Sequence, residues 1–170
     1  MATRKKKTIK SRKKPSILSQ GKALVTDKTF QAVIGILFIF IGLFIFFSII
    51  SYLFSWKEDF SLLTKEIVVT DENPIADYKN VLGKIGAKIG HLFVWNWFGI
   101  NSLFVSALIM LLGARISFKV RFFSLGRVFR HAAFWLVWLS LLFGFIKLGV
   151  QDVLNGGIGF MMASYLVSIA

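Results

Sequence analysis

The longest apolar run in the chain lies between Phe30 and Trp56 and contains no residue that is charged at neutral pH. Within it, 17 of the residues from Ala32 to Phe54 are Ile, Leu, Phe or Val. A helix of about 20 apolar residues crosses the hydrocarbon core of a bilayer, and each such side chain favours insertion by roughly 0.3–0.6 kcal/mol at the helix centre. The run therefore predicts a membrane span at about 30–54. It is too long for a cleaved signal peptide, and no small-residue cleavage site follows it.

Two later apolar stretches predict further spans, at about 98–114 and at about 132–150. As one straight helix, the region 81–114 would be about 50 Å long, well beyond the roughly 30 Å hydrocarbon core. We therefore expect a break at 96–99. We expect the part before the break, at about 82–95, to lie in the membrane interface, because it mixes basic with apolar residues. The fold class predicted is all-α, an integral membrane helical bundle with interfacial helices.

Polar side chains are rare in the predicted spans. Lys147 is in the last turn of the third span, and we expect its ammonium group to extend to the interface. A proton-relay role would need a buried carboxylate partner, and no span contains one. A transporter or channel should place polar or charged groups at mid-membrane, so a small transporter or channel subunit of the inner membrane is the less favoured alternative. The remaining polar groups of the spans are serines, Ser48, Ser51, Ser102, Ser106 and Ser140.

Basic residues are concentrated in two segments. Ten of the 21 Lys and Arg lie in residues 1–28, Lys5, Lys6 and Lys7 among them. This tail is too polar to fold and is expected to be disordered. Basic flanking segments stay in the cytoplasm, so we predict that the tail and the segment 115–130 are cytoplasmic, and that the acidic loop 57–80 and the turn 151–155 lie outside. The basic residues of the second cytoplasmic segment are Arg115, Lys119, Arg121, Arg127 and Arg130.

Two segments leave alternatives open. The tail either fixes topology alone or also contacts anionic lipid or DNA, at roughly 1 kcal/mol per basic residue near a charged membrane. A lipid- or DNA-tethering protein that acts through this tail is thus a third reading of the chain. In the acidic loop, the β-branched residues of 66–70 predict a short strand, and 71–74 reads as a turn.

A glycine pattern occurs twice. Gly83, Gly86 and Gly90 have the same kind of spacing as Gly156, Gly159 and Ala163. Small residues at this spacing let helices pack closely in membranes, and Gly99, which belongs to the break expected at 96–99, is a further candidate for helix packing. A duplication would make 156–170 a second interfacial helix; a truncated fourth span is the alternative.

No pattern of catalytic residues is present. The chain lacks a phosphate-binding G-x-x-x-x-G-K-[ST] loop and has no Cys. His91 and His131 lie near expected interfaces, where a polar interfacial role is favoured over metal ligation. We therefore predict no catalysis, no cofactor and no metal site within these residues.

The order of these features resembles the N-terminal four-span membrane domain of FtsK/SpoIIIE-family bacterial DNA translocases. The resemblance rests on the basic tail, the aromatic end of the first span at 51–56 and the acidic loop after it. It also rests on glycine and aromatic spacings, which include Asn80-x-x-Gly83-x-x-Gly86, Leu92-Phe93, Phe98-Gly99 and Gly156-Gly157-x-Gly159. It covers residues 30 to 170. The last span and the cytoplasmic motor of the family are not among these residues.

The resemblance implies a role in cell division. The whole protein would be an ATP-driven DNA pump at the division septum of the bacterial inner membrane, needed for chromosome partition. Residues 29–170 would be its multi-pass transmembrane domain, which anchors the motor in the lipid bilayer. ATP, Mg and DNA would bind the motor, outside these residues. The motor would also drive homo-oligomerisation, and other division proteins would be further partners.

Overall fold

The computed structural model describes residues 27–68, 78–118, 124–147 and 149–169. Every element in this part of the chain is a helix, so the prediction of an all-α bundle is confirmed. The tail with Lys5, Lys6 and Lys7 lies outside the described residues, as do the predicted turn at 71–74 and the basic residues Lys119 and Arg121.

The first helix, α2, runs over Lys28–Val68 and is 41 residues long. The prediction of a polar loop from residue 57 and of a strand at 66–70 is wrong as far as Val68. The helix continues because Trp56, Phe60 and Leu63 repeat at the helical spacing of three and four residues and extend one apolar face. Phe60 packs against Trp95, with ring centroids 4.7 Å apart. Tertiary packing thus extends α2 beyond its membrane-spanning part.

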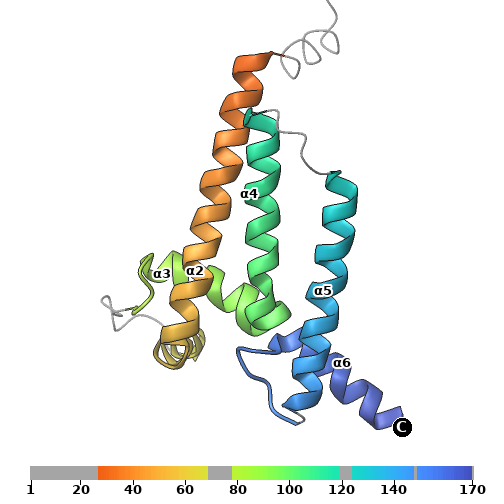
Figure 1. Cartoon of the computed structure of the whole chain (residues 1–170). Helices are drawn as coiled ribbons and strands as arrows, with labels where there is room; N and C mark the ends of the chain where they lie inside the picture. Colours follow the sequence, from red (N-terminus) through yellow and green to blue (C-terminus); the bar gives the residue numbers. More distant parts are fainter. Residues whose placement is uncertain (1–26, 69–77, 119–123, 148, 170) are drawn as a thin grey trace, which may run out of the picture.

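The second region begins with a bent helical unit. Helix α3 (Gly83–Gly90) continues directly into the π-helix η1 (His91–Phe98). The backbone then breaks at Trp97, which has non-helical dihedral angles, and at Gly99, which has a φ of 64°. A 3-10 turn, η2 (Gly99–Ser102), leads into α4 (Leu103–Phe118). The break lies inside the interval predicted, and Figure 1 shows α3 crossing α2 before the end of α2 and leading to the start of α4.

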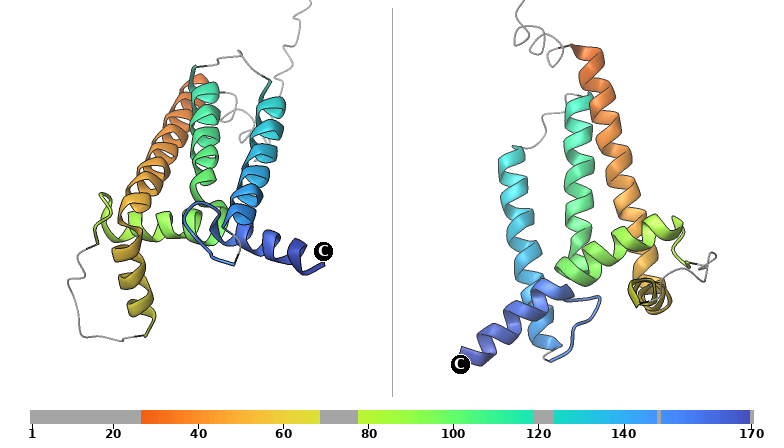
Figure 2. Two further views of the ribbon diagram at one scale, coloured as in Figure 1. Left: turned by 60° about the horizontal axis from the view of Figure 1, so that its bottom comes forward. Right: turned by 180° about the vertical axis from the view of Figure 1, so that it is seen from behind.

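The third region repeats this arrangement in part. Helix α5 spans Leu125–Ile146 and α6 spans Gly156–Ile169. Helix α5 begins ahead of the predicted span at 132–150 and also ends ahead of it, because the chain turns at Lys147 and at Gly149, whose φ is 80°. In both views of Figure 2, α6 leaves the end of α5 at an angle.

In the described part of the chain, three helices are long and apolar enough to cross a membrane: Lys28–Thr64, Gly83–Phe118 and Leu125–Ile146. The second includes the break at Trp97–Gly99, so its straight apolar part is α4. Helices α2 and α4 pack at small residues. A Cβ on Gly113 would lie 2.7 Å from the amide nitrogen of Ile39. Such close backbone approach is the usual way in which helices associate in membranes. Helix α5 packs mainly against α6.

Candidate functional site

A stripe of polar residues follows one face of α2 toward its C-terminal end. Its members are spaced three or four residues apart, so they share one helix face. All are buried under α3 and the segment before it: Ser48, Ser51, Tyr52, Ser55 and Asp59. We call this stripe, the segment 78–82, α3 and η1 together the first elbow. Because burying polar groups is costly unless they are hydrogen-bonded, their partners define what the first elbow does.

Asp59 is the most consequential residue of the stripe because its carboxylate is fully buried. Its Oδ1 accepts a hydrogen bond from the backbone N–H of Lys79 at 2.8 Å, and its Oδ2 accepts one from the Ser55 hydroxyl at 2.5 Å. Hydrogen bonds to charged acceptors are stronger than neutral ones. The carboxylate therefore ties the chain that returns toward α3 to the end of α2.

Asn80 and Ser51 continue the same attachment one turn further along. The Asn80 side-chain amide donates to the carbonyl oxygen of Ser48 at 3.1 Å, and its Oδ1 accepts from the N–H of Leu82 at 3.1 Å. The N–H of Val81 donates to the Ser51 hydroxyl at 2.8 Å. Backbone groups that no helix satisfies are thus paired with side chains of α2 or of the turn itself.

Aromatic residues of α2 and η1 pack against each other in the first elbow. The Tyr52 hydroxyl lies 2.9 Å from Nδ1 of His91, and the rings of Trp56 and Trp95 stack with centroids 5.7 Å apart. His91 therefore takes part in packing, and the described residues contain no cluster of metal-ligating side chains. Beside these rings lies a groove of about 560 Å³, which Phe60, His91 and Trp95 line together with Leu63, Thr64, Lys88 and Asn96.

The predicted packing glycines of the first elbow lie at three different places. A Cβ at Gly90 would meet the Tyr52 side chain, and would lie 2.8 Å from the carbonyl oxygen of Ser48. A Cβ at Gly86 would meet the Asn80 amide oxygen. Gly83 begins α3 with a φ of 63° and has open space around it. Gly86 and Gly90 thus lie where α3 approaches its neighbours most closely.

The second elbow consists of residues 151–169, which fold back on α5. Ser140 on α5 donates to the carbonyl oxygen of Asn155 at 2.6 Å. The Asn155 side chain is fully buried and donates to the carbonyl oxygen of Val150 at 3.1 Å. A Cβ at Gly159 would collide with the carbonyl oxygen of Ser140. Helix α6 therefore lies against the backbone of α5 itself.

The two elbows meet at a pair of glycines. Gly99 follows η1 and Gly156 begins α6, and both have a positive φ, 64° and 62°. A Cβ on Gly156 would collide with the backbone of Trp97 and of Gly99, and one on Gly99 would collide with the Leu154 carbonyl. The N–H of Ile100 also donates to the carbonyl oxygen of Val153 at 2.8 Å. Backbone contact at this point fixes how the first elbow sits on the second.

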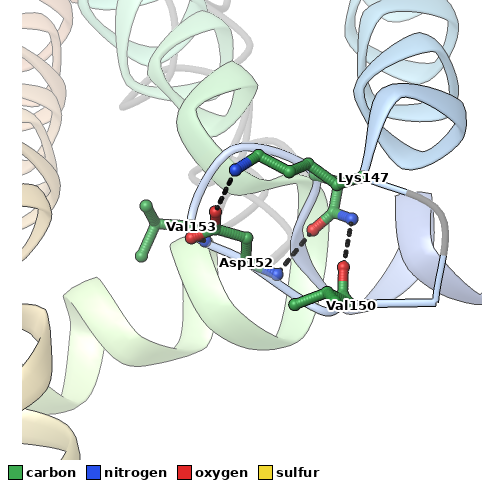
Figure 3. A network of polar contacts seen from close by, with 5 residues as sticks. Lys147, Val150, Asp152 and Val153 are labelled. Carbon is green, nitrogen blue, oxygen red and sulfur yellow. Dashed lines mark hydrogen bonds and ion pairs between the residues drawn. The ribbon is translucent and has the colours of Figure 1, made fainter.

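Lys147 lies directly after α5 and has an acidic partner. Its Nζ is 3.3 Å from a carboxylate oxygen of Asp152 in the turn that follows, as Figure 3 shows. Asp152 lies outside the predicted spans, so a carboxylate partner for Lys147 was not expected from the residues of the spans. The Lys147 side chain is 43% exposed. Its position at the end of the helix agrees with the expected extension toward the interface.

The basic residues predicted to set topology lie away from the elbows. Arg115 is in the last turn of α4, and Arg127 and Arg130 are in the first turns of α5. Figure 1 places these helix ends at the opposite end of the bundle from α3 and α6. The serines expected to be the polar groups of the spans are all buried, and each takes part in a hydrogen bond: Ser48, Ser51, Ser102, Ser106 and Ser140.

Asp59, Asn80 and Asn155 carry much of the polar network, and none was singled out as a site residue from the sequence. For Asp59 a signal existed: it lies four residues after Ser55 and seven after Tyr52, which continues the helical stripe of α2. For Asn80 and Asn155 only their position just before a glycine-rich helix start could have drawn attention.

A family model described as the 4TM region of DNA translocase FtsK/SpoIIIE matches residues 27–170 of the chain. The match begins where α2 begins and includes both elbows. No curated protein and no solved structure matches the chain.

Proposed function

Because the chain belongs to the family of FtsK/SpoIIIE DNA translocase 4TM regions, we propose that it is the membrane anchor and assembly module of a septal translocase. This translocase acts in cell division and chromosome segregation. The ATPase motor lies outside residues 27–170, and ATP, Mg and DNA bind there. The chain contributes no catalytic group to that reaction.

The observation that carries the proposal is that the buried polar side chains hold neighbouring segments together. Asp59, Asn80 and Asn155 each bond to backbone groups of neighbouring segments. Polar groups that hold helices in place do not offer a path for a solute. An anchor needs spans held rigidly to one another, and this network, together with the glycine contacts, provides that.

The proposed orientation places the N-terminus and the basic helix ends in the cytoplasm. Arg115, Arg127 and Arg130 lie at the end of the bundle away from α3 and α6. Arginines gathered at helix ends next to a short loop support this orientation under the positive-inside rule. The elbows then lie at the outer face of the inner membrane, with α3, η1 and α6 in its interface.

Assembly is the second part of the proposal. Homo-oligomerisation occurs through the motor, and the outer elbows present the surface that other division proteins contact. The groove of about 560 Å³ beside Trp95 lies on this surface. Aromatic residues such as Trp and Tyr are enriched where proteins bind one another.

The test of the anchor function uses the intact gene in its own cells. Residues 27–170 are replaced by an unrelated multi-pass segment of the same orientation, with the rest of the protein unchanged. We expect the exchanged protein to stay in the membrane but to lose septal localisation and to leave chromosomes trapped at division. Normal septal localisation and normal segregation of the exchanged protein would contradict the proposal.

Orientation is tested separately with reporter fusions. A reporter active only in the cytoplasm should be active when fused after Ser124, and a reporter active only outside should be active after Gln151 or Ala170. The reverse pattern would overturn the orientation without affecting the assignment to the family.

A further inference from the structure

An apolar groove lies between α4 and α5. It encloses about 510 Å³, within the roughly 300–1,000 Å³ typical of small-molecule sites. Helix α4 contributes Phe104, Ala107, Leu108 and Leu111 to its lining, and α5 contributes Arg127, Val128, His131, Ala132 and Trp135. Apart from two residues near the start of α5, the lining is apolar.

Of these two residues, Arg127 gives one end of the groove a positive charge. His131 lies one helical turn after it on α5, and both are exposed. Nδ1 of His131 is 2.7 Å from the carbonyl oxygen of Arg127. Because a carbonyl can only accept, Nδ1 carries the hydrogen. This hydrogen bond holds the His131 ring beside the start of α5.

The part of the sequence that forms the groove contains no carboxylate. The sequence has no Asp or Glu between Asp77 and Asp152. Asp152 is paired with Lys147 at the other end of α5. Among the described residues, the Arg127 guanidinium has no acidic partner. A positive group at the mouth of an apolar slot is complementary to an amphipathic anion.

We propose that this groove binds an anionic phospholipid. One acyl chain lies along the slot between Phe104 and Trp135, and the phosphate group accepts hydrogen bonds from the Arg127 guanidinium. An apolar protein helix would leave the arginine unpaired, whereas a phospholipid brings the apolar chain and the phosphate in one molecule. Basic pockets between transmembrane helices on the cytoplasmic side are known to suit anionic head groups. In the proposed orientation, the Arg127 end of the groove faces the cytoplasmic leaflet.

Trp135 provides the readout because it lines the groove. In a variant of the full chain, Trp56, Trp95, Trp97 and Trp138 are changed to Phe, and the protein is reconstituted in phosphatidylcholine vesicles. Phosphatidylglycerol with brominated acyl chains should quench the remaining Trp135 more strongly than brominated phosphatidylcholine at the same mole fraction. One basic contact corresponds to a preference of about five-fold. Arg127→Ala should remove that preference.

Arg130→Ala is the matched control. It removes an equal charge three residues after Arg127, and Arg130 does not line the groove. This variant should keep most of the preference for phosphatidylglycerol. Ala132→Phe fills the slot while leaving Arg127 in place, and it should reduce quenching by both lipids. Millimolar inorganic phosphate should not compete, since it lacks the acyl chain.

Three outcomes overturn the proposal. Equal quenching by the two brominated lipids would show that the site does not recognise the phosphate. An equal effect of Arg127→Ala and Arg130→Ala would reduce it to general surface charge. Efficient cross-linking of two chains through Ala132→Cys, with no lipid preference, would show that a second copy covers the groove.

If the single-tryptophan variant fails to fold, native mass spectrometry makes the same comparison. It counts the phosphatidylglycerol molecules retained by the unaltered chain, by Arg127→Ala and by Arg130→Ala.

Discussion

The two elbows solve the same structural problem with different chemistry. In each, a helix begins at a glycine with a positive φ, α3 at Gly83 and α6 at Gly156, and this helix packs across the long helix before it. The first elbow is attached by side chains, above all by the buried carboxylate of Asp59. The second is attached mainly by backbone, with Gly159 lying against the backbone of Ser140.

This difference determines which substitutions each elbow tolerates. Side-chain hydrogen bonds can be removed one at a time, and each contributes about 0.5–3 kcal/mol depending on charge. Backbone contacts at van der Waals distance leave no room for even one methyl group, and a clash there must displace a whole helix. We therefore expect the second elbow to fail in one step and the first to weaken gradually.

The largest effect is expected for Gly156→Ala. An alanine at a φ of 62° is strained, and its Cβ would collide with the backbone of Trp97 and Gly99. Together these terms should lower the free energy of unfolding by about 2–5 kcal/mol. Thermal unfolding in detergent, followed by tryptophan fluorescence, measures the loss.

Gly83→Ala is the control for this experiment, because Gly83 has nearly the same φ, 63°, and no atom within 4 Å of the added Cβ. It should cost only the backbone strain, about 1–2 kcal/mol. If Gly156→Ala and Gly83→Ala lose the same stability, the backbone contact between the elbows does not contribute, and the contrast between the two elbows is wrong.

A smaller effect is expected for Asp59→Ala in the first elbow. The change leaves the N–H of Lys79 and the hydroxyl of Ser55 without their carboxylate partner. We expect a loss of about 1.5–3 kcal/mol and faster hydrogen exchange at the Lys79 amide. Glu58→Ala removes a neighbouring exposed carboxylate and should change neither quantity. Unaltered exchange at Lys79 in the Asp59 variant would show that Asp59 does not hold this segment.

The same contrast explains what could be predicted from sequence. The apolar runs of α2 and α5 have lengths and compositions that leave few alternatives, so the bundle was predictable from them. The extension of α2 to Val68 was missed because charged residues at 57–59 resemble a loop, while the packing of Phe60 on Trp95 that stabilises the helix joins residues far apart in the chain. Tertiary contacts of this kind override local preference.

The candidate site was predictable to a lesser degree. The spacing of the glycines indicated where helices could pack, but it did not indicate which residues each glycine contacts. The contact between Gly99 and Gly156 depends on the whole fold and follows from no local sequence pattern. Asp59 was assigned to a solvent-exposed acidic loop, because burial of a carboxylate is rare and needs partners that sequence does not reveal.

The smallest effect is expected for the ion pair at the end of α5. Lys147 is 43% exposed and Asp152 is 23% exposed, and exposed pairs contribute about 0–1 kcal/mol. Lys147→Ala should therefore change the unfolding temperature little, and less still at high salt. Asp152→Ala should lower stability more, because Oδ1 of Asp152 also accepts a hydrogen bond from the N–H of Val153 at 2.7 Å.

The double variant Lys147→Ala/Asp152→Ala separates the contribution of the ion pair from that of the hydrogen bond to Val153. If its loss of stability equals the sum of the losses in Lys147→Ala and Asp152→Ala within about 0.5 kcal/mol, the pair is a minor part of the second elbow. A coupling energy above about 1 kcal/mol would mean that side chains hold the second elbow as they hold the first.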